Sequence, residues 1–194
     1  MKYINLVKEH FRDKPVFSLT DLRVFLSKKG ISKNYSNLLL HNLVKRKEVF
    51  RLNKGFYSFQ KDLSVSGFAF SPFYYGLQES LSLRNLWEQE SIPVIITPKK
   101  VRPGLRKILD SNVLIRRINR KMFFGFNSLK HFDFWLPVSD AEKTLIDFVY
   151  FNEPLSAETL KELKKKINKK KLFVYLKKCP KNTQIKVKKL FNSK

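Results

Sequence analysis

Polar side chains suited to contacts with DNA bases recur along one stretch of the first sixty residues. A helix that begins near Lys33 and buries its leucines would turn several of them toward the opposite side, namely Lys33, Asn34, Asn37 and His41. Asn can hydrogen-bond adenine through two atoms, Lys can reach guanine acceptors or phosphate, and His can do either more weakly. Recognition helices place their N-terminal residues against base edges. The pattern predicts a base-contacting helix face, and an ordinary polar helix surface is the alternative.

Three expected helices position these side chains. Apolar residues at helical spacing indicate a first helix at residues 3–11. Ser18 or Thr20 can cap a second helix, and Gly30 can end it because glycine readily adopts the left-handed conformation found at helix ends. Ser32 can cap the third helix, whose buried side would consist of Leu39, Leu40, Leu43 and Val44.

A β-hairpin is expected directly after the third helix. Residues 49–52 and 56–59 resemble strands, and a short turn with a glycine at its tip joins them. Arg51 and Lys54 on this hairpin suit contacts with phosphates or with the adjacent minor groove. Three helices followed by a hairpin are the element order of a winged helix-turn-helix, which we expect at residues 1–60 as a DNA-binding domain.

Residues that could support catalysis are few. The one close group of carboxylates is Asp140, Glu142 and Asp147. With Lys143 beside them, such acids could hold a metal ion in a nuclease, which is the less favoured alternative. Ser139 and Glu142 also fit a capping box, in which the two side chains satisfy the first amides of a helix. The sequence therefore predicts a protein that is not an enzyme and has no catalytic residues.

Metal and cofactor motifs are absent from the sequence. His10, His41 and His131 are widely separated and Cys179 stands alone, so no zinc-ligand spacing exists. There is no glycine-rich phosphate loop, and position suggests no Ser–His or Cys–His pair. We expect neither a metal ion nor a cofactor.

Targeting features are equally sparse. A single cysteine excludes an internal disulfide and fits a reducing cytosol. The first residues lack the apolar stretch of a signal peptide, and no uncharged apolar run approaches the roughly 20 residues needed to span a bilayer. We expect a cytoplasmic protein with no membrane partner.

Charge is distributed unevenly along the chain. The formal net charge is +24, from 40 Lys and Arg against 16 Asp and Glu, which is typical of a protein that binds a polyanion. Residues 1–60 carry a net +9, residues 61–150 a net +4 and residues 151–194 a net +11. An A/T-rich genome would raise Lys but would not remove Glu. For the lysine-rich tail we favour phosphate contacts, and a lipid surface, an acidic partner or a solvated face are alternatives.

Beyond residue 60 we expect a mixed domain at residues 61–194 that ends in a basic helical tail. The expected elements are a helix at 73–88, strands at 94–97, 113–115, 122–124 and 134–138, a helix at 141–151, and tail helices after Ser156. The aromatic run within residues 68–75 fits core packing better than stacking on single-stranded bases, because it lies in the least basic segment. These elements place the chain in the α+β class.

Three stretches of this middle region resemble the AbiEi-type antitoxins of abortive-infection systems. Residues 74–83 (YYGLQESLSL) are similar to the helix near the start of that family's second domain. Residues 93–97 (PVIIT) resemble a strand of the family, and residues 138–147 (VSDAEKTLID) resemble its helix with a Glu-Lys pair, a leucine and an aspartate. The hairpin sequence RLNKGFY at residues 51–57 fits the same architecture. The resemblance covers about residues 1–150, and the order of elements carries more of it than any single motif.

The resemblance implies a two-domain antitoxin of a type IV toxin–antitoxin pair. Members of the family repress their own operon by binding inverted repeats, and their second domain is needed to neutralise a nucleotidyltransferase toxin. We therefore expect a sequence-specific, autoregulating repressor whose partners are double-stranded DNA and such a toxin. A DNA-binding regulator without a toxin partner is the alternative.

Overall fold

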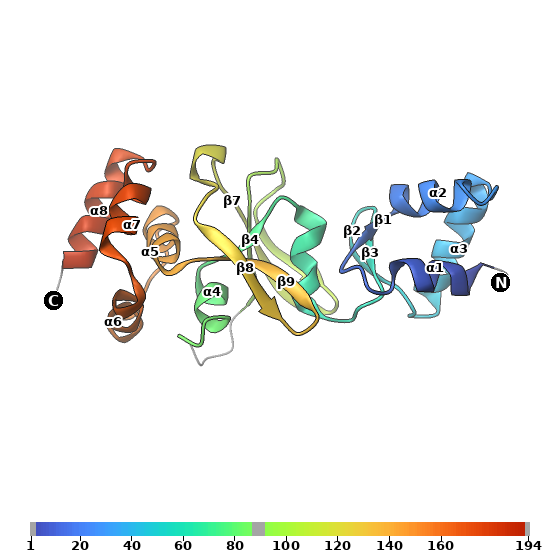
Figure 1. The fold of residues 1–194 in the computed structure, drawn as a ribbon, viewed down its shortest axis with the longest axis horizontal. Helices are drawn as coiled ribbons and strands as arrows, with labels where there is room; N and C mark the ends of the chain where they lie inside the picture. Colours follow the sequence, from blue (N-terminus) through green and yellow to red (C-terminus); the bar gives the residue numbers. More distant parts are fainter. Residues whose placement is uncertain (1–2, 87–91, 193–194) are drawn as a thin grey trace. The chain divides into compact units, whose positions relative to one another are not determined.

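The computed structural model describes residues 3–86 and 92–192, which form an α+β protein with two sheets (Figure 1). The chain divides into two compact units. The first comprises Met1–Ser71 with Lys107–Asn112, and the second comprises Pro72–Arg106 with Val113–Lys194. Each unit has a hydrophobic core of its own.

The first unit begins with the three predicted helices, α1 (Ile4–Phe11), α2 (Leu19–Ser27) and α3 (Lys33–Lys45). The Ser18 side chain accepts a hydrogen bond from the Asp21 amide, and Asp21 accepts one from the Ser18 amide, which completes a capping box on α2. Gly30, after the end of α2, has a φ of +72°. Ser32 caps α3 by accepting from the Tyr35 amide at 3.3 Å. The predicted helices and their capping residues are therefore confirmed.

A three-stranded antiparallel sheet completes the first unit. Its strands β1 (Phe17–Ser18), β2 (Phe50–Asn53) and β3 (Phe56–Ser58) lie in the order β1-β3-β2. The 3-10 helix η1 (Leu63–Phe70) contacts β2 and β3, so this unit continues beyond residue 60. The core lies between the helices and the sheet and consists of Ile4, Val7, Phe11, Phe17, Leu22, Leu26, Leu39, Leu40, Leu43 and Val49.

A six-stranded mixed sheet is the centre of the second unit. Its order is β6-β7-β5-β4-β9-β8, with strands β4 (Tyr74–Tyr75), β5 (Val94–Thr97), β6 (Gly104–Ile108), β7 (Ser111–Arg117), β8 (Phe126–His131) and β9 (Phe134–Ser139). β5 runs parallel to β7, and β4 runs parallel to β9, whereas β4–β5 and β8–β9 are antiparallel. The predicted strands at 94–97, 113–115 and 134–138 are confirmed.

Four helices follow β9 in the second unit. The first is α5 (Ala141–Tyr150), and the lysine-rich tail forms α6 (Ala157–Lys166), α7 (Lys169–Leu176) and α8 (Lys181–Asn192). α5 contacts α6, α7, α8 and β9, so it is the central helix of this group (Figure 1). Every residue of α5 from Ala141 to Phe148 is buried, including the charged ones.

Two predictions for the middle region are wrong. The expected helix at 73–88 is replaced by β4 and a short helix, α4 (Gln78–Ser82), while residues 87 and 88 lie outside the described residues. Tyr74 and Tyr75 are both fully buried although their side chains point to opposite faces of the sheet, so no alternation of polar and apolar residues marks β4 as a strand. The expected strand at 122–124 is also absent: Met122 ends a 3-10 turn, η2 (Arg120–Met122), and Phe123 and Phe124 follow it without regular structure. A three-residue apolar run does not distinguish a strand from a buried turn.

Close packing ends β4 at a glycine. A Cβ added to Gly76 would lie 2.4 Å from Cδ1 of Ile96 on the neighbouring strand, so any larger residue there would force the Ile96 side chain to move. The next residue, Leu77, has a φ of +55°, and α4 begins directly after it. This change of backbone direction separates β4 from α4, which the spacing of apolar residues had suggested were one helix. Of the aromatic run within residues 68–75, Phe70, Phe73, Tyr74 and Tyr75 are buried, as predicted, and Phe68 is half-buried.

Candidate nucleic-acid interface

The polar side chains of α3 face solvent. Lys33, Asn34, Asn37 and His41 are exposed, whereas Leu39, Leu40 and Leu43 are buried and Val44 is half-buried. α3 contacts α2, and its leucines join the core of the first unit. Its first turn holds no acidic residue, and its last residue, Lys45, is exposed together with Arg46 and Lys47 directly after it. One side of α3 therefore offers hydrogen-bonding groups and cations to the solvent without a neighbouring carboxylate on the same helix.

Arg23 of α2 is part of this surface and was not predicted from the sequence. Its Nη2 donates a hydrogen bond to Oδ1 of Asn37 at 2.9 Å, while its buried Nε has no partner within the described structure. The guanidinium fixes the orientation of the Asn37 amide and leaves its NH₂ group to donate elsewhere. The pairing depends on how α2 packs on α3, so no spacing within the sequence marks it.

The hairpin places two further cations in the first unit. Arg51 and Lys54 are exposed, and the register shifts between Arg51 and Asn53. Oδ1 of Asn53 accepts a hydrogen bond from the Lys54 amide at 2.9 Å, and Gly55 has a φ of +78°. Arg51 Nε lies 3.4 Å from the carbonyl oxygen of Asn53. The Asn53 and Arg51 side chains thus hold the tip through hydrogen bonds to its backbone, and Lys54 is exposed on this turn.

Two acids of the first unit, Asp21 and Glu48, have structural partners. Asp21 caps α2, and Glu48 forms an ion pair with Lys8 at 2.6 Å. Neither carboxylate belongs to α3 or to the hairpin strands. α3 and the hairpin strands therefore carry cations and no carboxylate of their own.

The tail exposes most of its lysines. α7 and α8 begin without an acidic residue in the first turn, and α6 ends with Lys164 to Lys166. Lys171 is an exception because its ammonium lies 2.9 Å from Asp140 and 3.2 Å from Glu142. Burial lowers the pKa of Lys171, but the hydrogen bonds to these two carboxylates outweigh it and raise the pKa above its ordinary value. The other exposed lysines are Lys161, Lys165, Lys166, Lys169, Lys170, Lys177, Lys178, Lys181, Lys186, Lys188 and Lys189.

The carboxylates considered for a nuclease have partners within the second unit. Asp140 Oδ1 accepts from the Lys143 amide, and its Oδ2 accepts from the Tyr175 hydroxyl at 2.8 Å. Glu142 Oε1 accepts from the Asn168 amide at 2.7 Å, which ties α5 to the start of α7. The predicted capping box of Ser139 and Glu142 is wrong: Asp140 is the N-cap of α5. Ser139 is the last residue of β9, and its hydroxyl forms a hydrogen bond with the hydroxyl of Thr144.

Lys143 and Asp147 form a fully buried ion pair one turn apart on α5. The Tyr74 hydroxyl donates to Asp147 Oδ2 at 2.9 Å, and Lys143 Nζ lies 5.4 Å from the Tyr74 ring centre and 5.2 Å from that of Phe124. Burial raises the pKa of Asp147, while the Lys143 charge and the hydrogen bonds from Lys143 and Tyr74 oppose that shift. Burial together with the Asp147 charge also raises the pKa of Tyr74 well above its ordinary range. Through these contacts, Lys143 and Asp147 link α5 to β4 in the core of the second unit.

Neither a metal group nor a membrane span is found in the part of the chain that the structure describes. Within residues 3–86 and 92–192, no three His, Cys, Asp or Glu side chains gather in a group that could hold a metal ion. None of the helices in those ranges is both long and apolar enough to cross a bilayer.

The fold is shared with a structurally characterised protein. No protein-family model matches the chain, and no curated protein matches it. Among solved structures, the chain is similar to the RV2827C protein from Mycobacterium tuberculosis, with a TM-score of 0.66 and 14% sequence identity. The alignment covers 99% of this chain and 77% of that one. At this identity the similarity shows a common α+β fold.

Proposed function

We propose that this chain is a sequence-specific regulator of transcription that binds double-stranded DNA through a winged helix-turn-helix formed by α1 to α3 and the β2–β3 hairpin. The observation that carries the proposal is the exposed face of α3. An α-helix fits the major groove, and residues near its N-terminus reach the base edges. Lys33, Asn34 and Asn37 occupy that part of α3 and are exposed.

The two elements next to α3 supply the remaining contacts. In this proposal α2 lies across the DNA backbone, and Arg23 holds the Asn37 amide in one orientation toward a base. Arg51 and Lys54 on the hairpin contact phosphates or the adjacent minor groove. His41, which lies further along the exposed side of α3, contacts the groove edge. The lysines of the tail add phosphate contacts that are independent of sequence.

We further propose that the regulator is an autoregulating antitoxin that neutralises a nucleotidyltransferase toxin. Its support is the resemblance of residues 74–83, 93–97 and 138–147 to the AbiEi-type family. These stretches contribute β4, β5 and β9, which are neighbours in the sheet: Tyr74 pairs with Ile96, and Tyr75 pairs with Val138. The stretches that resemble the family therefore meet in the core of the second unit. A regulator without a toxin shares all the DNA-binding features, and the gene immediately downstream distinguishes the two.

Footprinting on the DNA upstream of the chain's own gene tests the proposal. We expect protection of a short inverted repeat. Between about 50 and 200 mM salt the affinity should fall by about three orders of magnitude, because phosphate contacts release counterions. The DNA should remain intact after incubation with Mg²⁺ or Mn²⁺. Uniform protection of the whole fragment, or an affinity that does not change with salt, would contradict sequence-specific binding through a cationic surface.

A further inference from the structure

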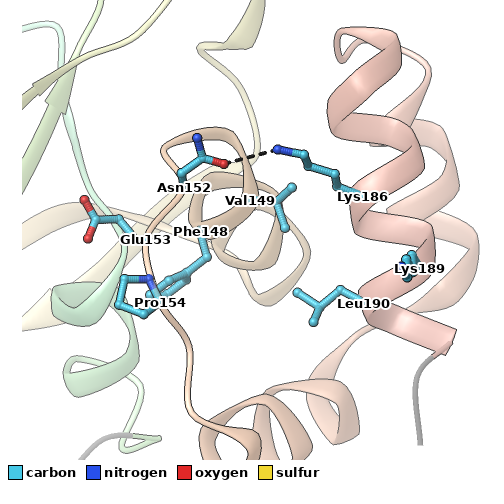
Figure 2. A pocket seen from close by; sticks show the side chains of 8 residues that line it. All are labelled: Phe148, Val149, Asn152, Glu153, Pro154, Lys186, Lys189 and Leu190. Carbon is cyan, nitrogen blue, oxygen red and sulfur yellow. Dashed lines mark hydrogen bonds between the residues drawn. The ribbon is translucent and has the colours of Figure 1, made fainter.

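A groove on the second unit lies between the end of α5 and α8 (Figure 2). It is wide and shallow, with a volume of about 530 Å³. Side chains from the last turn of α5, from the loop after it and from α8 surround the same space: Phe148, Val149, Asn152, Glu153, Pro154, Lys186, Lys189 and Leu190.

The floor of the groove is apolar. Phe148 is buried and belongs to the core, whereas Val149 and Leu190 are half-buried and turn toward the groove from α5 and α8 (Figure 2). Pro154 completes the floor on the loop side. The one carboxylate among the lining residues, that of Glu153, forms an ion pair with Arg116. The groove therefore offers apolar contact area without a free negative charge.

Lysines form the rim on the α8 side. Lys186 and Lys189 are both exposed, and Nζ of Lys186 donates to Oδ1 of Asn152 across the groove at 3.3 Å (Figure 2). α8 carries Lys181 and Lys188 as well and contains no acidic residue. An apolar floor beside a cationic rim is complementary to an anionic amphipathic ligand.

We infer that this groove docks an amphipathic helix of an acidic partner protein. The helix would insert one or two large apolar side chains against Val149, Leu190 and Pro154 and place Asp or Glu side chains beside Lys186 and Lys189. DNA fits the rim but not the floor, because a duplex offers no aliphatic side chain to an apolar groove. A fatty acyl chain fits less well because the groove is shallow, whereas such chains are best covered in an enclosed cavity. The inference rests on the proposed function in one respect: the proposed antitoxin has a protein partner.

A labelled synthetic peptide tests the inference on the full chain. The peptide is a helix-forming sequence with Leu and Phe along one face and Glu on the other, and its binding is followed by fluorescence anisotropy. Two related peptides replace either the apolar residues with Ser or the Glu residues with Lys. We expect only the first peptide to bind. The double variant Lys186→Glu/Lys189→Glu should weaken that binding by about tenfold or more through charge repulsion at the rim.

The matched control is Lys181→Glu/Lys188→Glu, which makes the same charge change on α8 away from the groove. This variant should bind the peptide within about twofold of the unaltered chain. Equal loss in both double variants, or equal binding of the Ser peptide, would overturn the inference because attraction would then come from net charge alone. Absence of peptide binding would overturn it directly, and so would displacement of the peptide by dodecanoate at equal affinity, which would assign the groove to a lipid.

Binding of the footprinted DNA, measured in parallel, separates this test from the proposed function. The preference for the footprinted sequence should persist in both double variants, whatever the result with the peptide.

Discussion

The buried ion pair of Lys143 and Asp147 illustrates how single residues stabilise the second unit. Both side chains are fully buried. Removing a charge from water costs several kcal/mol per ion, and the pair offsets this cost only when the remaining polar atoms are satisfied. The Tyr74 hydroxyl supplies one such bond, and the aromatic faces of Tyr74 and Phe124 lie close to the ammonium group. The pair thus joins α5 to β4 in the centre of the sheet.

Lys143→Met should lower the free energy of unfolding by about 3–5 kcal/mol, because it leaves the Asp147 charge buried without a partner. Urea denaturation measures the change. The double variant Lys143→Met/Asp147→Leu should be more stable than the single variant, since no unpaired charge remains. The exposed Lys170→Met is the control and should change stability by less than about 0.5 kcal/mol. If Lys143→Met equals the control, the pair contributes nothing to stability.

Cys179 has a thiol of low reactivity in the folded chain. It is 7% exposed and donates a hydrogen bond to the Tyr175 carbonyl oxygen. Burial raises the pKa of Cys179 from 9.0 to about 11, with a further contribution from Asp147 that the Lys143 charge opposes. Alkylation by iodoacetamide at pH 8 should therefore be about a hundredfold slower in the folded chain than in urea, because the thiolate is correspondingly rarer.

The raised pKa of Cys179 also predicts that the free energy of unfolding falls at alkaline pH. Because the pKa of Cys179 is higher in the folded chain than in the unfolded chain, its thiol stabilises the fold at pH values below 9.0. This stabilisation is lost as the pH rises from 9.0 toward 11. In Cys179→Ala, the free energy of unfolding should fall less between pH 8 and pH 10.5 than in the unaltered chain. Urea denaturation at the two pH values measures the difference. Rapid alkylation of the folded chain would contradict a buried, protonated thiol.

At the level of elements, α3 and the hairpin were predictable because each has a clear local pattern. Leucines at helical spacing fixed which side of α3 is buried, and Asn53-Lys54-Gly55 fixed the turn. The helix predicted at 73–88 failed because long-range pairing with β5 and β9 decides the structure of Tyr74 and Tyr75. The Arg23–Asn37 hydrogen bond also required the packed structure, since the two residues lie on different helices.

Asn37→Ala should relax sequence preference, whereas Lys54→Ala should weaken specific and non-specific DNA about equally. The physical reason is that an amide recognises a base edge, while a hairpin lysine contacts phosphate. Affinities for the footprinted duplex and for a scrambled duplex measure both effects. Arg23→Ala should act in the same direction as Asn37→Ala because it frees the Asn37 amide. If all three variants weaken both duplexes alike, the proposed division of roles is wrong.

At the scale of the whole molecule, the net charge of +24 predicts a polyanionic partner but not the surface that meets it. Composition could not separate α3 and the hairpin from the lysine-rich tail, because long-range attraction depends on the total charge. The α+β class followed from the order of elements, whereas the sheet order β6-β7-β5-β4-β9-β8 did not, since non-neighbouring strands pair through the core. Under the proposed function, charge supplies the affinity for DNA and its salt dependence, and the exposed face of α3 supplies the sequence specificity.

The most direct measurement compares two triple variants of the full chain on the footprinted duplex and on a scrambled one. The first is Lys33→Ala/Asn34→Ala/Asn37→Ala on α3, and the second is Lys164→Ala/Lys165→Ala/Lys166→Ala on α6. The account predicts that the α3 variant loses the preference for the footprinted duplex, while the α6 variant binds both duplexes more weakly and keeps its preference. An α3 variant that still prefers the footprinted duplex as strongly as the unaltered chain would contradict the central claim.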